Sequence, residues 1–189
     1  MPAVLDKSKP TKKRWTYEEY YRLDDDRRYE LSNGQLIPMI PPSPGASHQR
    51  ESRSLFRILH DFVDAKKLGE VFYAPLDVIF DAANTAQPDV MFIAKANAGI
   101  VQERGIFGAP DLVVEIVSPG SIRRDRYEKQ ALYARFGVKE YWILDHKNRA
   151  LEVLALDGAQ YRVHSSAEET GEVASKVLRG LKVKLADLF

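Results

Sequence analysis

The longest regular pattern of apolar and polar positions lies between residues 48 and 67. Apolar side chains recur there at the spacing of one face of an α-helix. They are Leu55, Ile58, Leu59, Phe62 and Val63. Arginines and lysines largely occupy the other faces, so the pattern predicts an amphipathic helix with one buried side. Ser47 is placed to cap the start of this helix, and Gly69 to end it.

The segment before this helix predicts a short helix and a hairpin. Thr16 is followed by two glutamates, which is typical of a helix N-terminus with a capping hydroxyl and acidic residues in its first turn. Further on, Asn33-Gly34 separates residues 29–31 from residues 35–39. Because Asn-Gly is the strongest two-residue signal for a β-hairpin, we expect these two runs to pair.

Runs rich in β-branched and aromatic residues predict the strands of a sheet. The runs are residues 71–80, 90–94, 112–117, 140–145, 150–156 and 160–165, with Asp157-Gly158 as a turn between the last two. A second helix is expected over residues 121–136, ending at Gly137. A strand, a helix and another strand usually place the two strands parallel. The order therefore predicts an α/β (α+β) fold, in which helices flank a mixed sheet.

Composition and charge limit the class of protein. The 189 residues are 44% hydrophobic, which suits a single domain with a substantial core, and we expect it to span residues 15–189. Residues 1–14 are polar and basic and are expected to form a flexible arm, either a solubilising tail or a DNA-binding arm. A net charge of +1 excludes a globally basic binder, so a nucleic-acid site needs a local basic patch.

Cysteine is absent from the chain, which excludes disulfides, thiolate zinc sites and cysteine nucleophiles. No run of residues is long and apolar enough to cross a membrane, and the first residues lack the apolar stretch of a signal peptide. We therefore expect a cytoplasmic protein with no membrane partner.

Two carboxylates stand in unusual surroundings. Glu115 lies inside the apolar run of residues 112–117, where a buried lone charge is costly unless it meets a cation, is protonated or faces a cleft. Asp89 directly precedes the apolar run of residues 90–94. If the two runs are neighbouring strands, the carboxylates meet at one end of the sheet and provide the oxygen ligands that Mg²⁺ prefers. The alternatives are a core ion pair for Glu115 and a strand-entry role for Asp89.

A lysine on the following helix is the third candidate. Asp125, Lys129 and Tyr133 recur at every fourth position, so they share one face of the expected helix. Tyr133 belongs near the buried side, which brings the ammonium of Lys129 within reach of the carboxylates. The alternative is a surface pair between Asp125 and Lys129, and the residues by themselves favour it.

Three stretches form a specific combination. They are Pro88-Asp89, Pro110-Asp111-Leu-Val-Val-Glu115-Ile-Val-Ser118-Pro119, and residues 124–145 with Lys129, Tyr133 and Phe136-Gly137-Val138-Lys-Glu140-Tyr-Trp142. Together they closely resemble the Uma-type restriction endonuclease family of the PD-(D/E)XK nuclease superfamily. The resemblance extends over roughly residues 29–145. It implies a restriction-endonuclease-like core, in which a mixed four-stranded sheet lies between helices.

The resemblance also implies roles for individual residues. Asp89 and Glu115 would be metal ligands, the backbone carbonyl of Ile116 would complete the metal site, and Lys129 would be the catalytic lysine. The usual superfamily motif has its lysine two residues after the acidic residue, where this chain has Val117. The lysine would therefore have moved to the helix. Glu30 and His48 are possible additional site residues.

The function that these roles imply is a Mg²⁺-dependent endonuclease acting on DNA, with Mn²⁺ as a possible substitute. Candidate phosphate contacts are Arg50, Arg53, Arg123, Arg124 and Arg126. A homodimer is plausible because two sites related by a twofold axis can cut both strands of a duplex. Two other interpretations stay open: an inactive nucleic-acid-binding module on the same fold, and an assembly module that uses the sheet and the terminal hairpin as a dimer surface.

Overall fold

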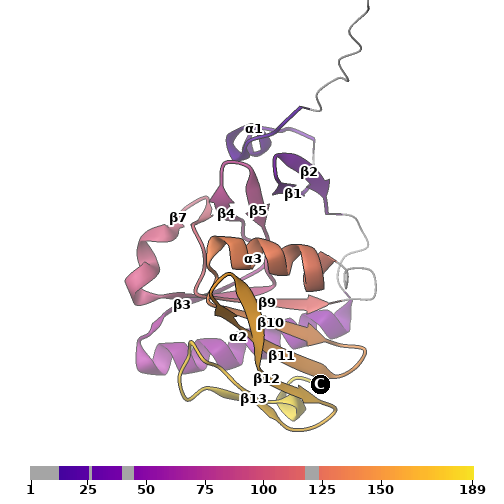
Figure 1. The fold of residues 1–189 in the computed structure, drawn as a ribbon, viewed down its shortest axis with the longest axis vertical. Coiled ribbons are helices and arrows are strands. Elements are labelled where there is room, and N and C mark those ends of the chain that lie inside the picture. Colours follow the sequence, from indigo (N-terminus) through magenta and orange to yellow (C-terminus); the bar gives the residue numbers. More distant parts are fainter. Residues whose placement is uncertain (1–12, 26, 40–44, 118–123) are drawn as a thin grey trace, which may run out of the picture.

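The main sheet of the computed structural model has six strands in the order β12-β11-β10-β9-β6-β3 (Figure 1). The structure describes residues 13–25, 27–39, 45–117 and 124–189. The strands of this sheet are β3 (Gly69–Tyr73), β6 (Val90–Ala94), β9 (Leu112–Val117), β10 (Glu140–Asp145), β11 (Ala150–Asp157) and β12 (Gln160–Glu168). The neighbours β9 and β10 run parallel and the other neighbours run antiparallel. The expected mixed sheet is therefore confirmed.

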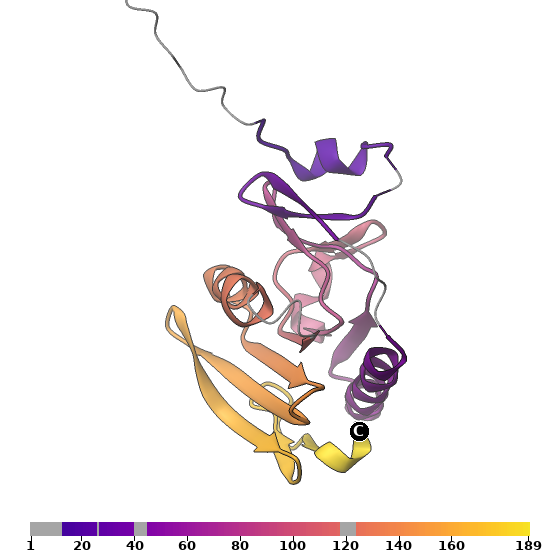
Figure 2. The same ribbon diagram turned by 90° about the vertical axis from the view of Figure 1, so that its right-hand side faces the viewer.

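Helices cover both faces of this sheet (Figure 2). One face packs against α2 (Ala46–Lys66), and the other against α3 (Gln130–Phe136), which continues a π-helical segment, η2 (Arg124–Lys129). Successive side chains of a strand point to opposite faces. In β9, Val114 and Ile116 share a core cluster with Leu55 of α2, whereas Val113 and Val117 share one with Tyr133 of α3. By this alternation Glu115 points to the α3 side.

The connection from β9 through α3 to β10 fixes the parallel pair. Glu140 of β10 lies beside Leu112 of β9, and Asp145 beside Val117. The helix ends at Gly137, which has a left-handed conformation with φ of 79°, as the sequence predicts. Val138 then packs in the same core cluster as Tyr133, so the chain returns directly to the sheet.

The N-terminal segment contains a short helix and a hairpin. Helix α1 (Tyr17–Tyr21) begins with a capping box formed by Thr16 and Glu19. Strands β1 (Tyr29–Ser32) and β2 (Gln35–Pro38) pair across the Asn33-Gly34 turn, and both turn residues have positive φ, as this type of hairpin requires. These elements lie above α3 in Figure 1. Both predicted elements are confirmed.

Further short strands complete the fold. A second sheet has the order β5-β4-β8-β7. Its strands are β4 (Val78–Asp81), β5 (Asn84–Ala86), β7 (Val101–Gln102) and β8 (Gly105–Phe107), and the 3-10 helix η1 (Lys95–Ile100) precedes β7. The backbone N–H of Leu31 donates to the hydroxyl of Thr85 at 2.8 Å, which ties β1 to this sheet. Near the C-terminus, β13 (Glu172–Ala174) pairs with β14 (Lys182–Lys184), and η3 (Leu185–Asp187) follows.

Several predicted boundaries are wrong. Residues 71–80 form two strands, β3 and β4, and Pro75 between them lacks the N–H that a continuous ladder needs. Helix α2 has Gly45 rather than Ser47 at its N-cap, and Lys67, with φ of 53°, rather than Gly69 at its C-cap. Strand β12 extends beyond residue 165 to Glu168.

Two predictions involve segments that the structure does not describe. The start of the helix expected over residues 121–136 and residues 1–12 of the expected arm lie outside the described residues. Within the described residues, none of the helices combines the length and the apolar character needed to cross a membrane.

Candidate active site

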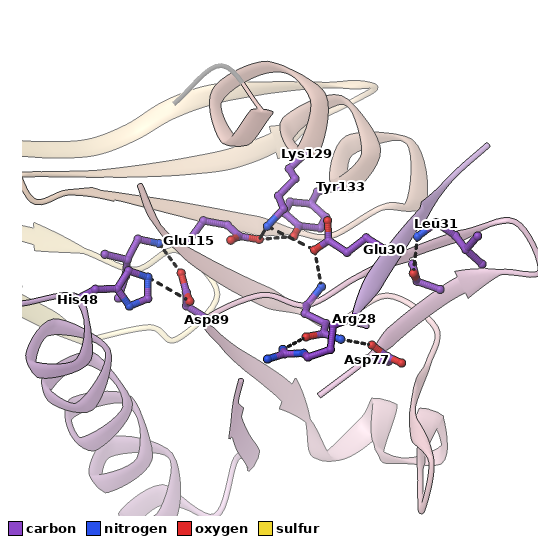
Figure 3. A network of polar contacts seen from close by, with 12 residues as sticks. Arg28, Glu30, Leu31, His48, Asp77, Asp89, Glu115, Lys129 and Tyr133 are labelled. Carbon is purple, nitrogen blue, oxygen red and sulfur yellow. Dashed lines mark hydrogen bonds and ion pairs between the residues drawn. The ribbon is translucent and has the colours of Figure 1, made fainter. Parts of the chain in front are cut away.

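Asp89 and Glu115 lie at the same end of two neighbouring antiparallel strands, with Asp89 directly before β6 and Glu115 within β9. Val90 of β6 pairs with Val114 of β9, and the next residues outward are Asp89 and Glu115. The register of the sheet therefore places the two residues that the sequence singles out at the same end of the sheet, and Figure 3 draws both of them.

Asp89 links the end of the sheet to helix α2. Its Oδ2 accepts a hydrogen bond from the backbone N–H of Ile116 at 2.8 Å, and its Oδ1 lies 3.3 Å from Nε2 of His48. His48 stands in the first turn of α2, where it comes close to this end of the sheet. Both side chains are almost one-fifth exposed, so this part of the site is open to a small ion or substrate.

Glu115 is held by two donors from the helix above it. Nζ of Lys129 lies 2.8 Å from Glu115 Oε1, and the hydroxyl of Tyr133 donates to the same oxygen at 2.5 Å. All three residues are buried, with Glu115 only 3% exposed. Lys129 is thus buried and contacts Glu115, whereas the side chain of Asp125, its partner in the alternative surface pair, lies outside the described residues.

The N-terminal hairpin adds a third carboxylate. Glu30 of β1 lies 3.7 Å from Nζ of Lys129 and accepts a hydrogen bond from the backbone N–H of Gln87 at 2.9 Å. The side chain of Gln87 continues this network by donating to Asp77 at 2.6 Å and by accepting from Arg28 (Figure 3). Lys129 therefore sits between two buried carboxylates, which offset its charge in a region of low dielectric constant.

Two groups near the site have shifted pKa values. Burial of the His48 ring opposes its charged form, but the contact with Asp89, the charge of Glu51 and the carbonyl of Ile116 outweigh burial and raise the pKa of His48. Burial also raises the pKa of Asp77, against the opposing effects of Gln87 and Arg28. The negative charges of Asp89 and Glu51 thus lie close enough to the His48 ring to favour its charged form.

The donor set at Asp89 suits a hard divalent cation. Asp89, Glu115 and the carbonyl of Ile116 are oxygen donors, and Mg²⁺ is usually held by one or two carboxylates together with water and substrate phosphate. The described part of the chain has no group of three or more His, Asp or Glu side chains arranged to hold a metal ion. Glu115 contacts Lys129 and Tyr133. The oxygen donors fit such an ion without a group of that kind.

Two grooves lie beside the site. One has a volume of about 720 Å³ and is lined by His48, Ile116 and basic side chains that include Arg50, Lys147 and Arg149. The other, of about 540 Å³, shares Arg50 and adds Arg53 and the exposed ring of Tyr73. The local basic patch that a nucleic-acid site requires is therefore present, although the net charge of the chain is only +1.

The structure brings some of the residues singled out in the sequence together and does not describe others. Asp89, Glu115, Lys129, Glu30 and His48 all belong to one contact network. Asp111, which belongs to the Pro110-Asp111 stretch of the resemblance, directly precedes β9 and contacts Lys139 and the backbone N–H of Ala94. Arg123 and the side chains of Arg124, Asp125 and Arg126 lie outside the described residues.

Three contributors were missed by the sequence prediction. The Tyr133 hydroxyl contacts Glu115, and the spacing of Tyr133 from Lys129 was the available signal. Glu51, one turn after His48 on α2, is buried and contacts His146. Nothing in the sequence around His146 indicated that it would lie next to α2.

Comparisons with known proteins give a family from one search and a similar fold from another. Residues 17–186 match the Uma2 family, described as "Putative restriction endonuclease". Among solved structures, the chain is similar to a protein from Anabaena variabilis described as "a putative nuclease belonging to DUF820". The TM-score is 0.74 at 19% sequence identity, and the match covers 92% of this chain and 97% of the other. No curated protein matches the chain.

Proposed function

Because the chain belongs to the Uma2 family, we propose that it is a metal-dependent endonuclease that hydrolyses phosphodiester bonds in DNA. The observation that supports this most directly is that Lys129 lies 2.8 Å from Glu115 of β9, while Asp89, directly before β6, accepts a hydrogen bond from the N–H of the adjacent residue Ile116. Two carboxylates and an ammonium group beside an open groove suit phosphodiester hydrolysis, which depends mainly on positioning and on compensation of charge.

Asp89, Glu115 and the carbonyl of Ile116 are the proposed ligands of Mg²⁺, with Mn²⁺ as a substitute. When bound, such an ion polarises the scissile phosphate and lowers the pKa of a coordinated water. Asp89 is already positioned for this role, because its Oδ2 is held by the Ile116 N–H and its Oδ1 faces His48. Glu115 is positioned by Tyr133 and Lys129.

Lys129 is the proposed catalytic lysine. Its ammonium is fixed between Glu115 and Glu30, so it offers positive charge and N–H donors at a defined place without further reorganisation. There it orients the attacking water, or offsets the negative charge that develops on the phosphate. The lysine fulfils this role from the helix after β9, because Val117 occupies its usual position on the strand.

DNA is the proposed substrate, bound along the two grooves that flank the N-terminal half of α2. Arg50 belongs to both grooves, and Lys147 and Arg149 extend the positive charge past Ile116. Cations at this spacing suit the phosphates of a nucleic-acid backbone. A homodimer, which would present two sites to a duplex, and a cytoplasmic location are part of the same proposal.

A nicking assay on supercoiled plasmid tests the activity. Purified protein with Mg²⁺ or Mn²⁺ is expected to nick the plasmid, and EDTA is expected to stop the reaction. Glu115→Gln and Asp89→Asn keep the size of the side chains but lose the charge, and each is expected to abolish nicking. Glu172→Gln is the matched control, because Glu172 is a surface carboxylate paired with Lys182 on the C-terminal hairpin.

Failure of the wild-type protein to cut plasmid, linear, single-stranded and RNA substrates, together with no metal binding by calorimetry, would contradict the enzymatic proposal. Retained DNA binding in that case would support an inactive binding module. Cleavage that persists in Glu115→Gln would place the active site elsewhere.

A further inference from the structure

Two buried polar atoms on helix α2 lack a hydrogen-bond partner. Among the described residues, the buried side-chain atoms without a hydrogen-bond partner are Nδ1 of His48 and Oε2 of Glu51. Such atoms normally find partners, because a buried polar atom without a partner loses its hydrogen bond to water and gains none in return. Residues separated by three positions on a helix lie on the same face, so the two orphan atoms belong to neighbouring side chains.

Each of the two residues is held on its other side. Nε2 of His48 lies 3.3 Å from Asp89, and Oε1 of Glu51 contacts Nδ1 of His146. Glu51 is only 2% exposed, whereas the side chain of His146 is half exposed at the edge of the groove. The arrangement is a line of four side chains, from Asp89 through His48 and Glu51 to His146, with its gap between His48 and Glu51.

Metal-binding histidines almost always donate their second ring N–H to a carboxylate or carbonyl, which fixes the tautomer and the direction of the ring. We propose that Glu51 is a positioning residue for His48: it accepts Nδ1–H of His48 and leaves the Nε2 lone pair directed at the cation held by Asp89. This inference rests on the proposed metal-dependent function. It makes His48 a ligand of the ion and His146 the support of Glu51.

A purely structural role for Glu51 leads to different expectations. Oε1 of Glu51 contacts Nδ1 of His146, so Glu51 could act only by holding α2 against the chain after β10. Glu51→Gln would then destabilise the protein and leave metal affinity unchanged. A positioning role predicts the reverse, because a glutamine amide can donate to His48 Nδ1, which satisfies the orphan nitrogen and fixes the wrong tautomer.

The test measures Mn²⁺ affinity by titration calorimetry in wild type and Glu51→Gln, and thermal unfolding of both in EDTA. We expect the affinity of Glu51→Gln to fall about 10- to 100-fold, with unfolding temperature equal or higher. Histidine ¹⁵N spectra in Mg²⁺ are expected to show wild-type His48 protonated at Nδ1. Glu172→Gln, which removes one exposed carboxylate, should bind Mn²⁺ like the wild type.

His146→Ala is a second variant that keeps Glu51 and decides the question if Glu51→Gln does not fold. It should lower Mn²⁺ affinity by a smaller factor, whereas His164→Ala, on the exposed strand β12, should not. Wild-type affinity in both Glu51→Gln and His146→Ala would overturn this inference and leave the proposed function standing. A wild-type protein that binds no Mn²⁺ would overturn both.

Discussion

The ammonium of Lys129 lies 2.8 Å from Oε1 of Glu115, although the two residues belong to different elements of the fold. Glu115 points to the α3 side of β9, and Lys129 is the last residue of the π-helical segment that leads into α3. A lysine on the strand two residues later would share the face of Glu115. The helix thus places the ammonium group of Lys129 on the same side of the sheet as Glu115.

This contact makes Lys129 the first residue to change. Lys129→Gln keeps an N–H donor for Glu115 but removes the charge, so the protein should stay folded while its cleavage rate falls at least about 100-fold. Lys182→Gln is the control, because Lys182 also pairs with a carboxylate but lies on β14. Single-turnover cleavage of a labelled duplex in Mn²⁺ measures the effect. An unchanged cleavage rate in Lys129→Gln would show that Lys129 is not a catalytic residue.

Tyr133 is expected to matter through its hydroxyl. Tyr133→Phe keeps the ring contacts with Phe80 and Tyr141 but removes the hydrogen bond to Glu115. The free energy of unfolding should fall by about 1 kcal/mol. The cleavage rate should fall as well, because Glu115 is less firmly positioned. Tyr161→Phe loses a comparable bond to the Val138 carbonyl, so it should show the stability loss with normal cleavage. Equal cleavage by both variants would speak against a positioning role for Tyr133.

The central part of the site could be predicted because its signals are local. Glu115 stands out as a carboxylate in an apolar strand, and Asp89 precedes the strand that pairs with it. The placement of Lys129 needed the family resemblance, since the residues themselves favoured a surface pair. Lys129 can reach Glu115 only when helix α3 packs on the face of β9 that carries Val113 and Val117. That packing is a tertiary contact, which the local sequence does not indicate.

Other features depend on contacts that no local pattern records. Residues 84–86 form a short run with only one apolar residue, so nothing marks them as β5. Asn84 and Thr85 are nevertheless buried, because they accept hydrogen bonds from the backbone of the N-terminal hairpin. Glu51 looks like a solvent-facing residue of an amphipathic helix. It is buried because β10 ends beside α2 and brings His146 against it.

Asp77 gives a prediction about pH and stability. Burial raises its pKa, so the folded protein holds this proton more tightly than the unfolded chain. Its contribution to stability is therefore fully present below the unfolded pKa and is lost as the pH rises through the folded pKa. Asp77→Asn keeps an oxygen to accept from Gln87, so it should be more stable than wild type at neutral pH.

The advantage of Asp77→Asn should shrink as the pH falls below the raised pKa, where wild-type Asp77 is itself neutral. Urea unfolding between pH 4 and 8 measures both proteins. Asp157→Asn, at an exposed carboxylate paired with Arg162, is the control. Its stability relative to wild type should not rise with pH in the way expected for Asp77→Asn. A variant that is less stable than wild type at every pH would mean that the charge of Asp77 is needed for the contact network around Gln87.

The basic grooves give a prediction that does not depend on cleavage. Arg50 and Lys147 line the groove that passes Ile116, so both should contact phosphates of bound DNA. Arg50→Ala and Lys147→Ala should each weaken DNA binding similarly for all sequences, and each should reduce the slope of log affinity against log salt by about 1. Fluorescence anisotropy in EDTA measures binding without cutting. Arg162→Ala, at an exposed arginine on β12, should leave both quantities unchanged. If all three variants behave alike, the DNA path does not run along α2, and the grooves beside the site serve another ligand.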